Sequence, residues 1–496
     1  MFQIQSYLKM KKLVYTIALL ISSNLMMAQN DNWFDKNGVL LDAYRDDNGL
    51  LAEEFLPDAF EFTSLEEALR TPEKVFKLNL GDKMLTEFPP EIFELLNLQV
   101  LDLWKNEIRE IPQGIEKLSN LQYLNMGANQ LTNLPDELCK LKNLLMLDFE
   151  GNFITVLPAA IGDLENLTNF GLGGNQLTSL PESVGSLINL VNFTLWGNQL
   201  SVLPESFGNQ IALQSLDISE NQLTNLPQSI GSLQSLMICD LHGNQLSQLP
   251  ETISKLNQLP YLNVSNNKIT SLPATLGGMS FLQMLDISSN QISELPGSLG
   301  DLKSLQELLV SQNNVSEIPK SIGKMMFLST IDLSKNKVKA VPKEIGNVTN
   351  LKELNLSFNQ LLIIPKEIGK LEFLENLNLF NNQLTEIPKE IGKLKSLIEL
   401  NLYYNNLTVL PDEIGTLTNL EILHAASNQL ISLPVTIGQL LKLKQLNLKD
   451  NFLVKIPDSV KNLTELRYFN VENNAIPEEE SERIKAFFSG TTITKF

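Results

Sequence analysis

Residues 351–369 read LKELNLSFNQLLIIPKEIG, and the same spacing of residue types returns along most of the 496-residue chain. Asparagine stands at every twenty-third position from Asn106 to Asn474, seventeen times without a gap. An apolar residue always lies three positions before it, and proline lies six positions after it in sixteen of the seventeen repeats. Such self-similarity at a fixed period is typical of a solenoid, in which each repeat contacts only its neighbours.

The half of each repeat that leads up to the asparagine predicts one short strand. Its LxLxx pattern alternates apolar and polar residues, as a strand with one buried face does. Repeats stacked about 4.8 Å apart would pair these strands into a parallel sheet. The asparagine is expected to bury its amide and to bond backbone groups of its own and the neighbouring repeat, because a buried amide needs hydrogen-bond partners.

The half that follows the asparagine predicts no long helix. Proline at position +6 from the asparagine lacks an amide hydrogen and fixes φ, and glycine at position +10 of many repeats permits a turn. We therefore expect this half to be extended or to form a single 3-10 turn.

Written as LxxLxLxxNxLxxIPxxIG, the repeat resembles the leucine-rich repeat family in its 23-residue bacterial form with a proline-led second half. With a degenerate first copy around Lys83 and Pro89, the resemblance covers about eighteen repeats within residues 73–480. It implies an α/β repeat solenoid, a leucine-rich repeat horseshoe with a parallel concave sheet and a mostly extended or 3-10 convex side. It also implies a binding role, although a fold alone does not name the ligand.

The first 28 residues have the order of a secretory signal peptide. Lysines precede an apolar stretch from Leu13 to Met27, and cleavage is expected after Ala28. The stretch is too short and too interrupted to span a bilayer comfortably. We therefore expect an exported protein without a stable membrane anchor, located in a periplasm, at the cell surface or in the medium. Translation from Met1 and from Met10 both fit this order.

The solenoid is predicted to occupy residues 73–476 and to be covered at both ends, since the end repeats of a solenoid need a cap. Residues 29–72 form an acidic N-terminal segment that ends in a predicted cap helix, in which Ser64 and Glu67 make a capping box. Residues 477–496 read as a C-terminal capping helix and tail, with acids at the start and apolar residues on one face.

The composition leaves few candidates for catalysis. The chain has two histidines, and its net charge of −19 disfavours nucleic acid because phosphate binding needs a basic field. Cys139 and Cys239 cannot make a disulfide framework for a chain of this length and are expected to be core residues. The sequence contains no phosphate-binding loop, HExxH or GxSxG motif, so neither an enzyme nor a cofactor is predicted.

One set of carboxylates allows two interpretations. Position −4 from the asparagine is Asp or Asn in thirteen of the seventeen repeats, and Asp217 and Asp240 fall on adjacent strands. At a strand spacing of about 5 Å they would suit an acid pair or a cation site. A solvated polar ladder without metal is the favoured interpretation, because an acid–base pair also needs two different environments. The acidic middle of the chain would in either case steer a basic partner.

Positions −6, −4, −2 and −1 are expected to line the concave face, and they vary most between repeats. Three consecutive repeats and the start of the next place aromatic and amide side chains together there, which is the composition of an interaction hot spot. The predicted partner-binding residues are Phe358, Phe380, Tyr403, Tyr404, Asn355, Asn378, Asn401 and His424. Trp196 is a second candidate, because glycines at 171, 173 and 174 on the preceding strand would leave a dent beside its ring.

These patterns predict an exported, non-enzymatic scaffold that binds a partner protein along its concave face. A surface adhesin or glycan-binding protein is the alternative, since aromatic platforms beside amides also suit a sugar. An intracellular signalling scaffold is a third interpretation, against which the predicted signal peptide argues.

Overall fold

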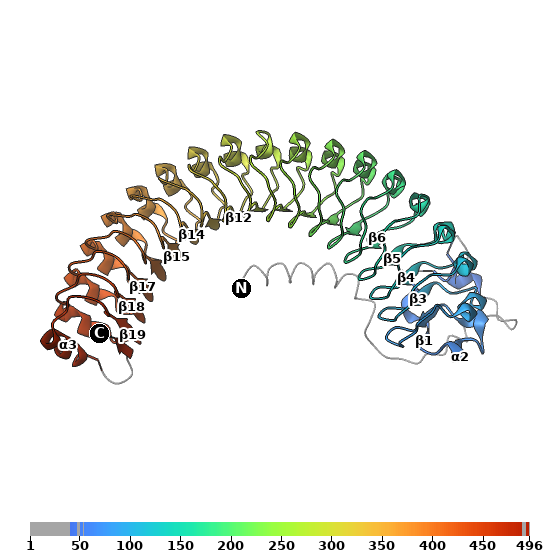
Figure 1. The fold of residues 1–496 in the computed structure, drawn as a ribbon, viewed down its shortest axis with the longest axis horizontal. Helices are drawn as coiled ribbons and strands as arrows, with labels where there is room; N and C mark the ends of the chain where they lie inside the picture. Colours follow the sequence, from blue (N-terminus) through green and yellow to red (C-terminus); the bar gives the residue numbers. More distant parts are fainter. Residues whose placement is uncertain (1–39, 47–49, 53, 489–492, 496) are drawn as a thin grey trace. The chain divides into compact units, whose positions relative to one another are not determined.

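The computed structural model describes residues 40–46, 50–52, 54–488 and 493–495 (Figure 1). The predicted signal peptide therefore lies outside the described residues. The chain divides into two compact parts, an N-terminal part (Met1–Gln176) and a C-terminal part (Leu177–Phe496), and each is described by itself.

In the N-terminal part, short strands pair in chain order into a parallel sheet, and the register joins residues 23 positions apart, such as Asp102 and Asn125. The strands are β1 (Glu61–Phe62), β2 (Lys77–Asn79), β3 (Val100–Asp102), β4 (Tyr123–Asn125), β5 (Met146–Asp148) and β6 (Asn169–Gly171). The helices are α2 (Leu65–Ala68) and the 3-10 helices η2 (Asp42–Tyr44), η3 (Leu56–Asp58), η4 (Pro72–Lys74), η5 (Pro90–Glu94), η6 (Gln113–Lys117), η7 (Asp136–Lys140) and η8 (Ile161–Asp163).

The C-terminal part repeats the same plan, with the strands on its inner, concave side and the 3-10 helices on its outer side (Figure 1). The strands are β7 (Asn192–Thr194), β8 (Ser215–Asp217), β9 (Ile238–Asp240), β10 (Tyr261–Asn263), β11 (Met284–Asp286), β12 (Glu307–Leu309), β13 (Thr330–Asp332), β14 (Glu353–Asn355), β15 (Asn376–Asn378), β16 (Glu399–Asn401), β17 (Ile422–His424), β18 (Gln445–Asn447), β19 (Tyr468–Asn470) and β20 (Ile493–Lys495). The helices are η9 (Glu182–Ser186), η10 (Glu205–Asn209), η11 (Gln228–Ser232), η12 (Glu251–Lys255), η13 (Leu276–Gly278), η14 (Gly297–Asp301), η15 (Lys320–Lys324), η16 (Lys343–Asn347), η17 (Lys366–Lys370), η18 (Lys389–Lys393), η19 (Asp412–Thr416), η20 (Val435–Gln439), η21 (Asp458–Asn462) and α3 (Glu478–Lys485).

The alternation in LxLxx explains the strands. In β14, Leu354 is buried in the core, whereas Glu353 and Asn355 on either side of it reach the inner surface. Because the neighbouring strands obey the same alternation, the inward leucines form continuous columns. The predicted leucine-rich repeat solenoid with a parallel sheet and 3-10 turns on the return side is confirmed.

Proline and glycine shape the return half of each repeat. Pro365 is extended, with φ −70°, and directly precedes η17. Gly369 lies inside η17, where a β-carbon would approach the Glu390 carbonyl oxygen of the next repeat to 2.5 Å. The glycine is therefore required by close packing of successive 3-10 helices, rather than by a turn as its position in the sequence suggests.

The repeat asparagines from Asn106 to Asn451 are buried and paired, as predicted, and Asn474 in the last repeat is paired but half-buried. In Asn359, Nδ2 donates to the carbonyls of Leu333 (2.9 Å) and Leu356 (3.0 Å), and Oδ1 accepts from the Val338 amide (2.9 Å). One side chain thus bonds the preceding repeat at two points and its own repeat at one. A second asparagine column runs along the return half at position +14, where Asn350 Nδ2 donates to the Met326 carbonyl of the preceding repeat at 2.7 Å.

The residue directly before the repeat asparagine adopts a left-handed backbone conformation, which the repeat pattern did not predict. This φ is 68° at Gly151, 53° at Phe358 and 57° at Tyr404. Glycine and asparagine tolerate this region, whereas other side chains are strained there. The strand therefore ends in a tight turn that lifts the side chain at position −1 away from the core.

Both ends of the described chain carry additional elements. α2 lies where the capping box predicts a helix, with Ser64 Oγ accepting from the Glu67 amide at 3.4 Å. In α3, Arg483 pairs with Asp458 and donates to the Ile456 carbonyl at 2.7 Å, which ties the helix to the last full repeat. Phe488, which follows α3, lies 5.3 Å from the ring of Phe469 between centroids.

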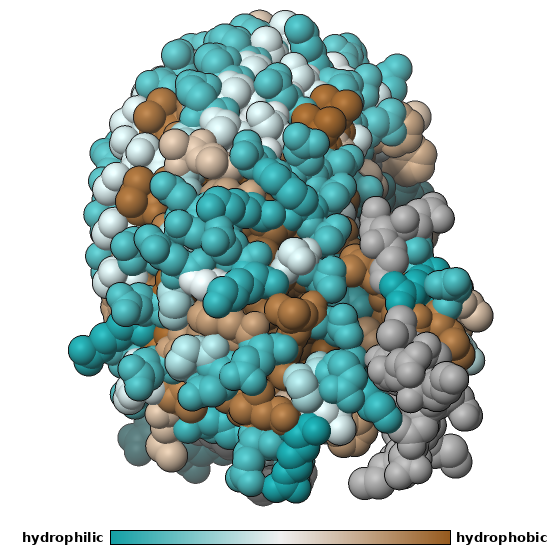
Figure 2. Space-filling model, turned by 90° about the vertical axis from the view of Figure 1, so that its right-hand side faces the viewer, coloured by the Kyte–Doolittle hydropathy of each residue, from teal (hydrophilic) through white to brown (hydrophobic). Residues whose placement is uncertain are grey.

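Cys139 and Cys239 are free and buried, in agreement with the predicted core role. On the side of the molecule that Figure 2 shows, hydrophobic residues form separate groups among hydrophilic ones. Within the described ranges, no helix has both the length and the apolar character that crossing a membrane requires.

Candidate functional site

The strands of the C-terminal part place two side chains of each repeat on the inner surface, at positions −6 and −4. The turn after the strand adds the side chains at −2 and −1. The predicted partner-binding residues from Asn355 to His424 occupy these positions from β14 to β17, so the structure brings them onto one surface.

Four rings of this surface form one continuous group, which we call the aromatic cluster: Phe358, Phe380, Tyr403 and Tyr404. Phe380 lies at its centre, stacked on Tyr403 with a centroid distance of 5.1 Å and an interplanar angle of 7°. Phe358 meets Phe380 edge to face at 4.7 Å. Tyr404 contacts Tyr403 at 4.9 Å, so rings from three successive repeats are joined.

The outer rings of the aromatic cluster remain accessible to a partner. Phe358 is 39% exposed and Tyr404 is 55% exposed. Both have a left-handed backbone, a conformation that costs a non-glycine residue about 1–2 kcal/mol. Large aromatic residues are thus held in a strained and exposed position where most other repeats carry small or polar residues.

Asparagine side chains border the aromatic cluster at position −4. Oδ1 of Asn378 accepts from the Phe380 amide and Oδ1 of Asn401 accepts from the Tyr403 amide, each at 3.1 Å. Among the described residues, no hydrogen bond occupies Nδ2 of either side chain, so both amides keep free donors. His424 continues this row and is half-buried, and burial lowers the pKa of its imidazole below 6.5.

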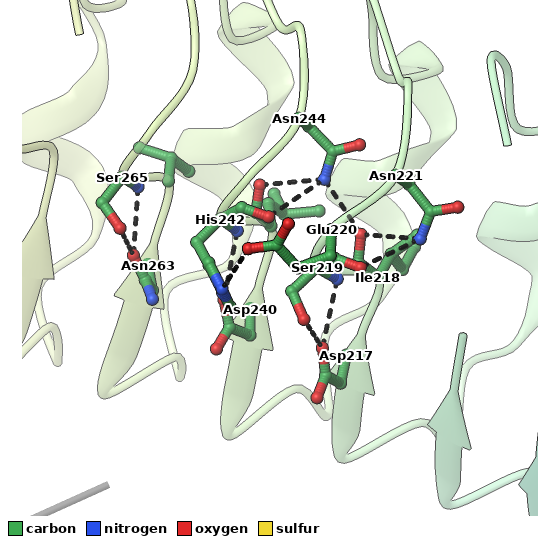
Figure 3. Close-up of polar contacts among 12 residues, drawn as sticks. Asp217, Ile218, Ser219, Glu220, Asn221, Asp240, His242, Asn244, Asn263 and Ser265 are labelled. Atoms are coloured by element: carbon green, nitrogen blue, oxygen red, sulfur yellow. Dashed lines mark hydrogen bonds and ion pairs between the residues drawn. The ribbon is translucent and has the colours of Figure 1, made fainter. Parts of the chain in front are cut away.

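The same −4 position carries an acid or an amide in four consecutive earlier strands of the C-terminal part, β8 to β11. We call Asp217, Asp240 and Asp286, with Asn263 between the last two, the acidic column. Figure 3 shows Asp217, Asp240 and Asn263 of this column. In each of these residues Oδ1 accepts from the backbone amide at position −2 and also contacts the side chain there. The side-chain contacts are Ser219 Oγ on Asp217 (2.5 Å), His242 Nδ1 on Asp240 (2.8 Å), Ser265 Oγ on Asn263 (2.7 Å) and Ser288 Oγ on Asp286 (2.6 Å).

His242 links two repeats through carboxylates. Nδ1 lies 2.8 Å from Asp240 Oδ1, and Nε2 lies 3.3 Å from Glu220 Oε1 of the preceding repeat. The hydrogen bond to Asp240 and the charges of Asp240, Glu220 and Asp217 raise the pKa of the imidazole above 6.5, against the effect of burial. The sequence carries this signal as a histidine two positions after an aspartate, but no role was predicted for His242.

The interpretation as a solvated ladder is wrong for Asp217 and Asp240, whereas Asp286 of the same column is only half-buried. Asp217 is 8% exposed and Asp240 is 2% exposed, because the residues at position −2 fold over them. The alternative cation site gains no support either, since the described ranges contain no group of three or more potential metal ligands. The acids instead fix the turn that follows each strand.

Trp196 is half-buried and follows β7 in the C-terminal part. The glycines that were expected to leave a dent beside it lie in the N-terminal part. At Gly171 the space is taken, because a β-carbon would lie 3.0 Å from Asp148 Oδ1 and 3.3 Å from Glu150 Cγ. The dent beside Trp196 stays a prediction, and Trp196, which lies seven repeats before the repeat of Phe358, is outside the aromatic cluster.

Family models for leucine-rich repeats match much of the chain. The leucine-rich repeat region model matches residues 113–202, 251–360, 310–404 and 342–424, and a second leucine rich repeat model matches residues 73–131 and 211–269. No curated protein gives a significant match.

Several solved structures are similar over most of the chain. A Leptospira interrogans leucine-rich repeat protein is 34% identical with a TM-score of 0.66, covering 88% of this chain and 100% of its own. A plant peptide hormone receptor, RGFR1 in complex with RGF2, is 26% identical with a TM-score of 0.55, covering 90% of this chain and 87% of its own. An internalin of Listeria monocytogenes is 27% identical with a TM-score of 0.53, covering 61% of this chain and 86% of its own.

Proposed function

The chain belongs to the leucine-rich repeat family, and from this premise we propose that it is a protein-binding scaffold without catalytic activity. The partner protein contacts the inner face of the C-terminal part, with the aromatic cluster as the hot spot and Asn378, Asn401 and His424 beside it. Structural relatives such as the plant receptor in complex with RGF2 support a binding role for such a solenoid.

The observation that carries the proposal is the openness of the aromatic cluster. Its rings touch one another, but Phe358 and Tyr404 stay exposed, and the amides beside them keep free donors. Aromatic residues concentrate binding energy because they bury large areas at little cost in side-chain entropy. If these strained aromatic residues only shielded the sheet, replacing them by smaller side chains would not weaken the binding of a partner.

A glycan is the second candidate ligand, and one observation favours it. Phe380 and Tyr403 stack with an interplanar angle of 7°, next to the donors of Asn378 and Asn401, and rings beside amides suit a sugar as well as a polypeptide. A surface adhesin would then be the function. An intracellular signalling scaffold has no observation in its favour beyond the repeat type.

We also propose that the protein is exported. The charged and apolar order of residues 1–28 supports this, as do the internalin and the other bacterial relative among similar structures. A fraction that begins at Gln29 by N-terminal sequencing and is recovered outside the cytoplasm is the expected result. Uncleaved protein confined to the cytoplasm would favour the signalling scaffold instead.

A photo-cross-linking amino acid at Phe358 tests the binding function. Envelope and extracellular fractions are exposed to the purified chain, and cross-linked proteins are identified by mass spectrometry. The control carries the same amino acid at Phe281, which is 53% exposed and lies between η13 and β11, away from the inner face. A protein captured from position 358 alone, which then binds the purified chain by calorimetry, is the expected result.

Two further variants make this experiment decisive. Phe380→Ala with Tyr403→Ala and Tyr404→Ala removes three of the four rings of the aromatic cluster. Phe281→Ala with Phe327→Ala and Phe373→Ala removes three exposed rings elsewhere. Binding should be lost in the first variant and kept in the second. If both variants bind the partner equally well, the proposed site is wrong. If no protein partner is found and the first variant loses binding to a glycan, the adhesin function is favoured.

A further inference from the structure

A hollow opens on the inner face of the C-terminal part directly beside the aromatic cluster. It has a volume of about 160 Å³, and its floor is the strand backbone at Leu354 and Leu377, whose side chains are buried in the core on the other side of the sheet. Polar side chains at positions −6 and −4 of three adjacent strands form its walls, namely Glu353, Asn355, Asn376, Asn378 and Glu399. These strands, β14 to β16, also carry the rings of the cluster.

Two of the lining side chains are carboxylates without a cation. Glu353 pairs in register with Asn376, and Asn376 with Glu399, so the two acids lie two strands apart, or about 10 Å. Neither carboxylate has an ion pair or side-chain hydrogen bond with a described residue. Burial, and after it the negative charge of Glu353, raises the pKa of Glu307 two strands away.

The other groups around the hollow are uncharged. Nδ2 of Asn378 and Asn401 can donate to a carbonyl, and burial keeps the pKa of His424 low, so this histidine does not supply a positive charge. Nearby Lys352 lies 3.6 Å from Glu375 and is thus paired already. A partner that fits must bring its own positive charge to the hollow and an apolar group to the rings.

We propose that the hollow receives a lysine or arginine side chain of the partner protein, while an apolar or aromatic residue next to it packs on Phe380 and Tyr403. The alkyl stem of the basic residue would lie between the side chains of Asn355, Asn376 and Asn378, and its charge would meet Glu353 and Glu399. The ring faces beside the hollow add a cation–π contribution. This inference rests on the proposed function, since it names the kind of segment that the aromatic cluster recognises.

Peptide display against the purified full chain tests the inference without knowledge of the natural partner. Random peptides are selected on the chain that carries the photo-cross-linking amino acid at position 358. The peptides that become cross-linked to this position are sequenced and made synthetically. Their affinities are measured for the wild type, for Glu353→Gln with Glu399→Gln, and for Glu372→Gln with Glu386→Gln. The last variant removes two exposed acids of the same repeats outside the hollow, so it is matched in charge.

We expect the selected peptides to be enriched in lysine or arginine beside an apolar residue. Their affinity should fall about tenfold in the Glu353→Gln, Glu399→Gln variant and stay unchanged in the matched control. Selected peptides without a basic residue, or equal affinities for the two variants, would overturn the inference. If such peptides still depend on Phe380, Tyr403 and Tyr404, only the inference fails; if no selected peptide depends on them, the proposed binding site fails as well.

Discussion

The acidic column and the two asparagines beside the aromatic cluster, Asn378 and Asn401, occupy the same position −4 of their repeats, but their side-chain oxygens are paired differently. In the acidic column, serine or histidine at −2 folds back onto the acid or amide at −4, and the contact between Ser219 and Asp217 measures 2.5 Å. In the aromatic cluster, Phe380 and Tyr403 stand at −2, and Asn378 and Asn401 keep only the backbone contact.

This difference shows how a constant frame produces a local binding surface. Asn355 still has its serine, with Ser357 Oγ at 2.8 Å, so it resembles the acidic column even though it lies next to the rings. The exchange of serine for an aromatic residue at −2 therefore does two things in one step. It removes an internal hydrogen-bond donor, and it adds an exposed hydrophobic surface.

The largest effect is expected on partner affinity, measured by calorimetry, when side chains of the aromatic cluster and of the acidic column are substituted in separate variants. Phe380→Ala with Tyr403→Ala and Tyr404→Ala should weaken binding about 100-fold, or about 2.8 kcal/mol, because hot-spot rings are lost. Asp217→Asn with Asp240→Asn and Asp286→Asn should change affinity less than about threefold, since these groups face their own turns. A larger loss of affinity in the acidic variant would mean that the acidic column, and not the aromatic cluster, is the binding site.

The two histidines should differ in their importance for stability. His242→Ala leaves Asp240 buried without its side-chain partner, which should lower the free energy of unfolding by about 1–3 kcal/mol in urea titrations. His424→Ala should cost less than about 0.5 kcal/mol, as expected for a surface substitution that breaks no network. Equal costs would mean that the bridge from His242 to Asp240 contributes nothing to the fold.

Serine at position −2 can be used to restore the side-chain contact to Oδ1 of Asn378 and Asn401. In Phe380→Ser with Tyr403→Ser, each new hydroxyl is expected to donate to the asparagine Oδ1 at −4, as Ser357 does to Asn355. This variant should be more stable than Phe380→Ala with Tyr403→Ala by about 1 kcal/mol, the contribution of ordinary hydrogen bonds. Both should bind the partner equally weakly. A serine variant no more stable than the alanine one would show that the fold-back contact depends on more than the residue at −2.

The smallest expected effect is on proton binding by the two histidines. The pKa of His242 should be shifted upward and the pKa of His424 downward. His242 should titrate above 6.5 and His424 below 6.5 when followed by NMR of selectively labelled histidine. The stability that His242 contributes is then complete below its ordinary pKa and is lost as the pH rises through the raised value. For His424 the contribution is present above the ordinary pKa and is lost as the pH falls through the lowered value. Titration in the reverse order would contradict the electrostatic description of both regions.

The sequence sufficed for the fold because every repeat specifies the same geometry. Asn359, Leu354 and Pro365 each have equivalents in almost all repeats, so the strand, the buried amide and the 3-10 return could be predicted from periodicity alone. The left-handed turn at −1 was missed because Phe358 and Tyr404, which disfavour it, occupy the position in the most prominent repeats. Repeats with glycine there, such as the one containing Gly151, held the better signal.

The candidate site was predictable as a set of residues but not as an arrangement. Periodicity placed Phe380 and Tyr403 on one surface, but only the structure shows their rings stacked at 5.1 Å. The burial of Asp240 could not be read from the repeat pattern, because it depends on the direction in which His242 folds. Side-chain direction at −2 is thus the information that the pattern lacks.

The hydrogen bonds between repeats always join the same two positions of successive copies, as Asn359 does with Val338 and Leu333. An in-frame duplication of one repeat in the gene would therefore yield a longer protein in which every new carbonyl and amide finds a partner. A single-codon insertion would instead misalign each of these bonds at once. The length of such a protein can change by recombination in whole repeats, while point mutations at −2 and −1 are free to move the recognition surface along it.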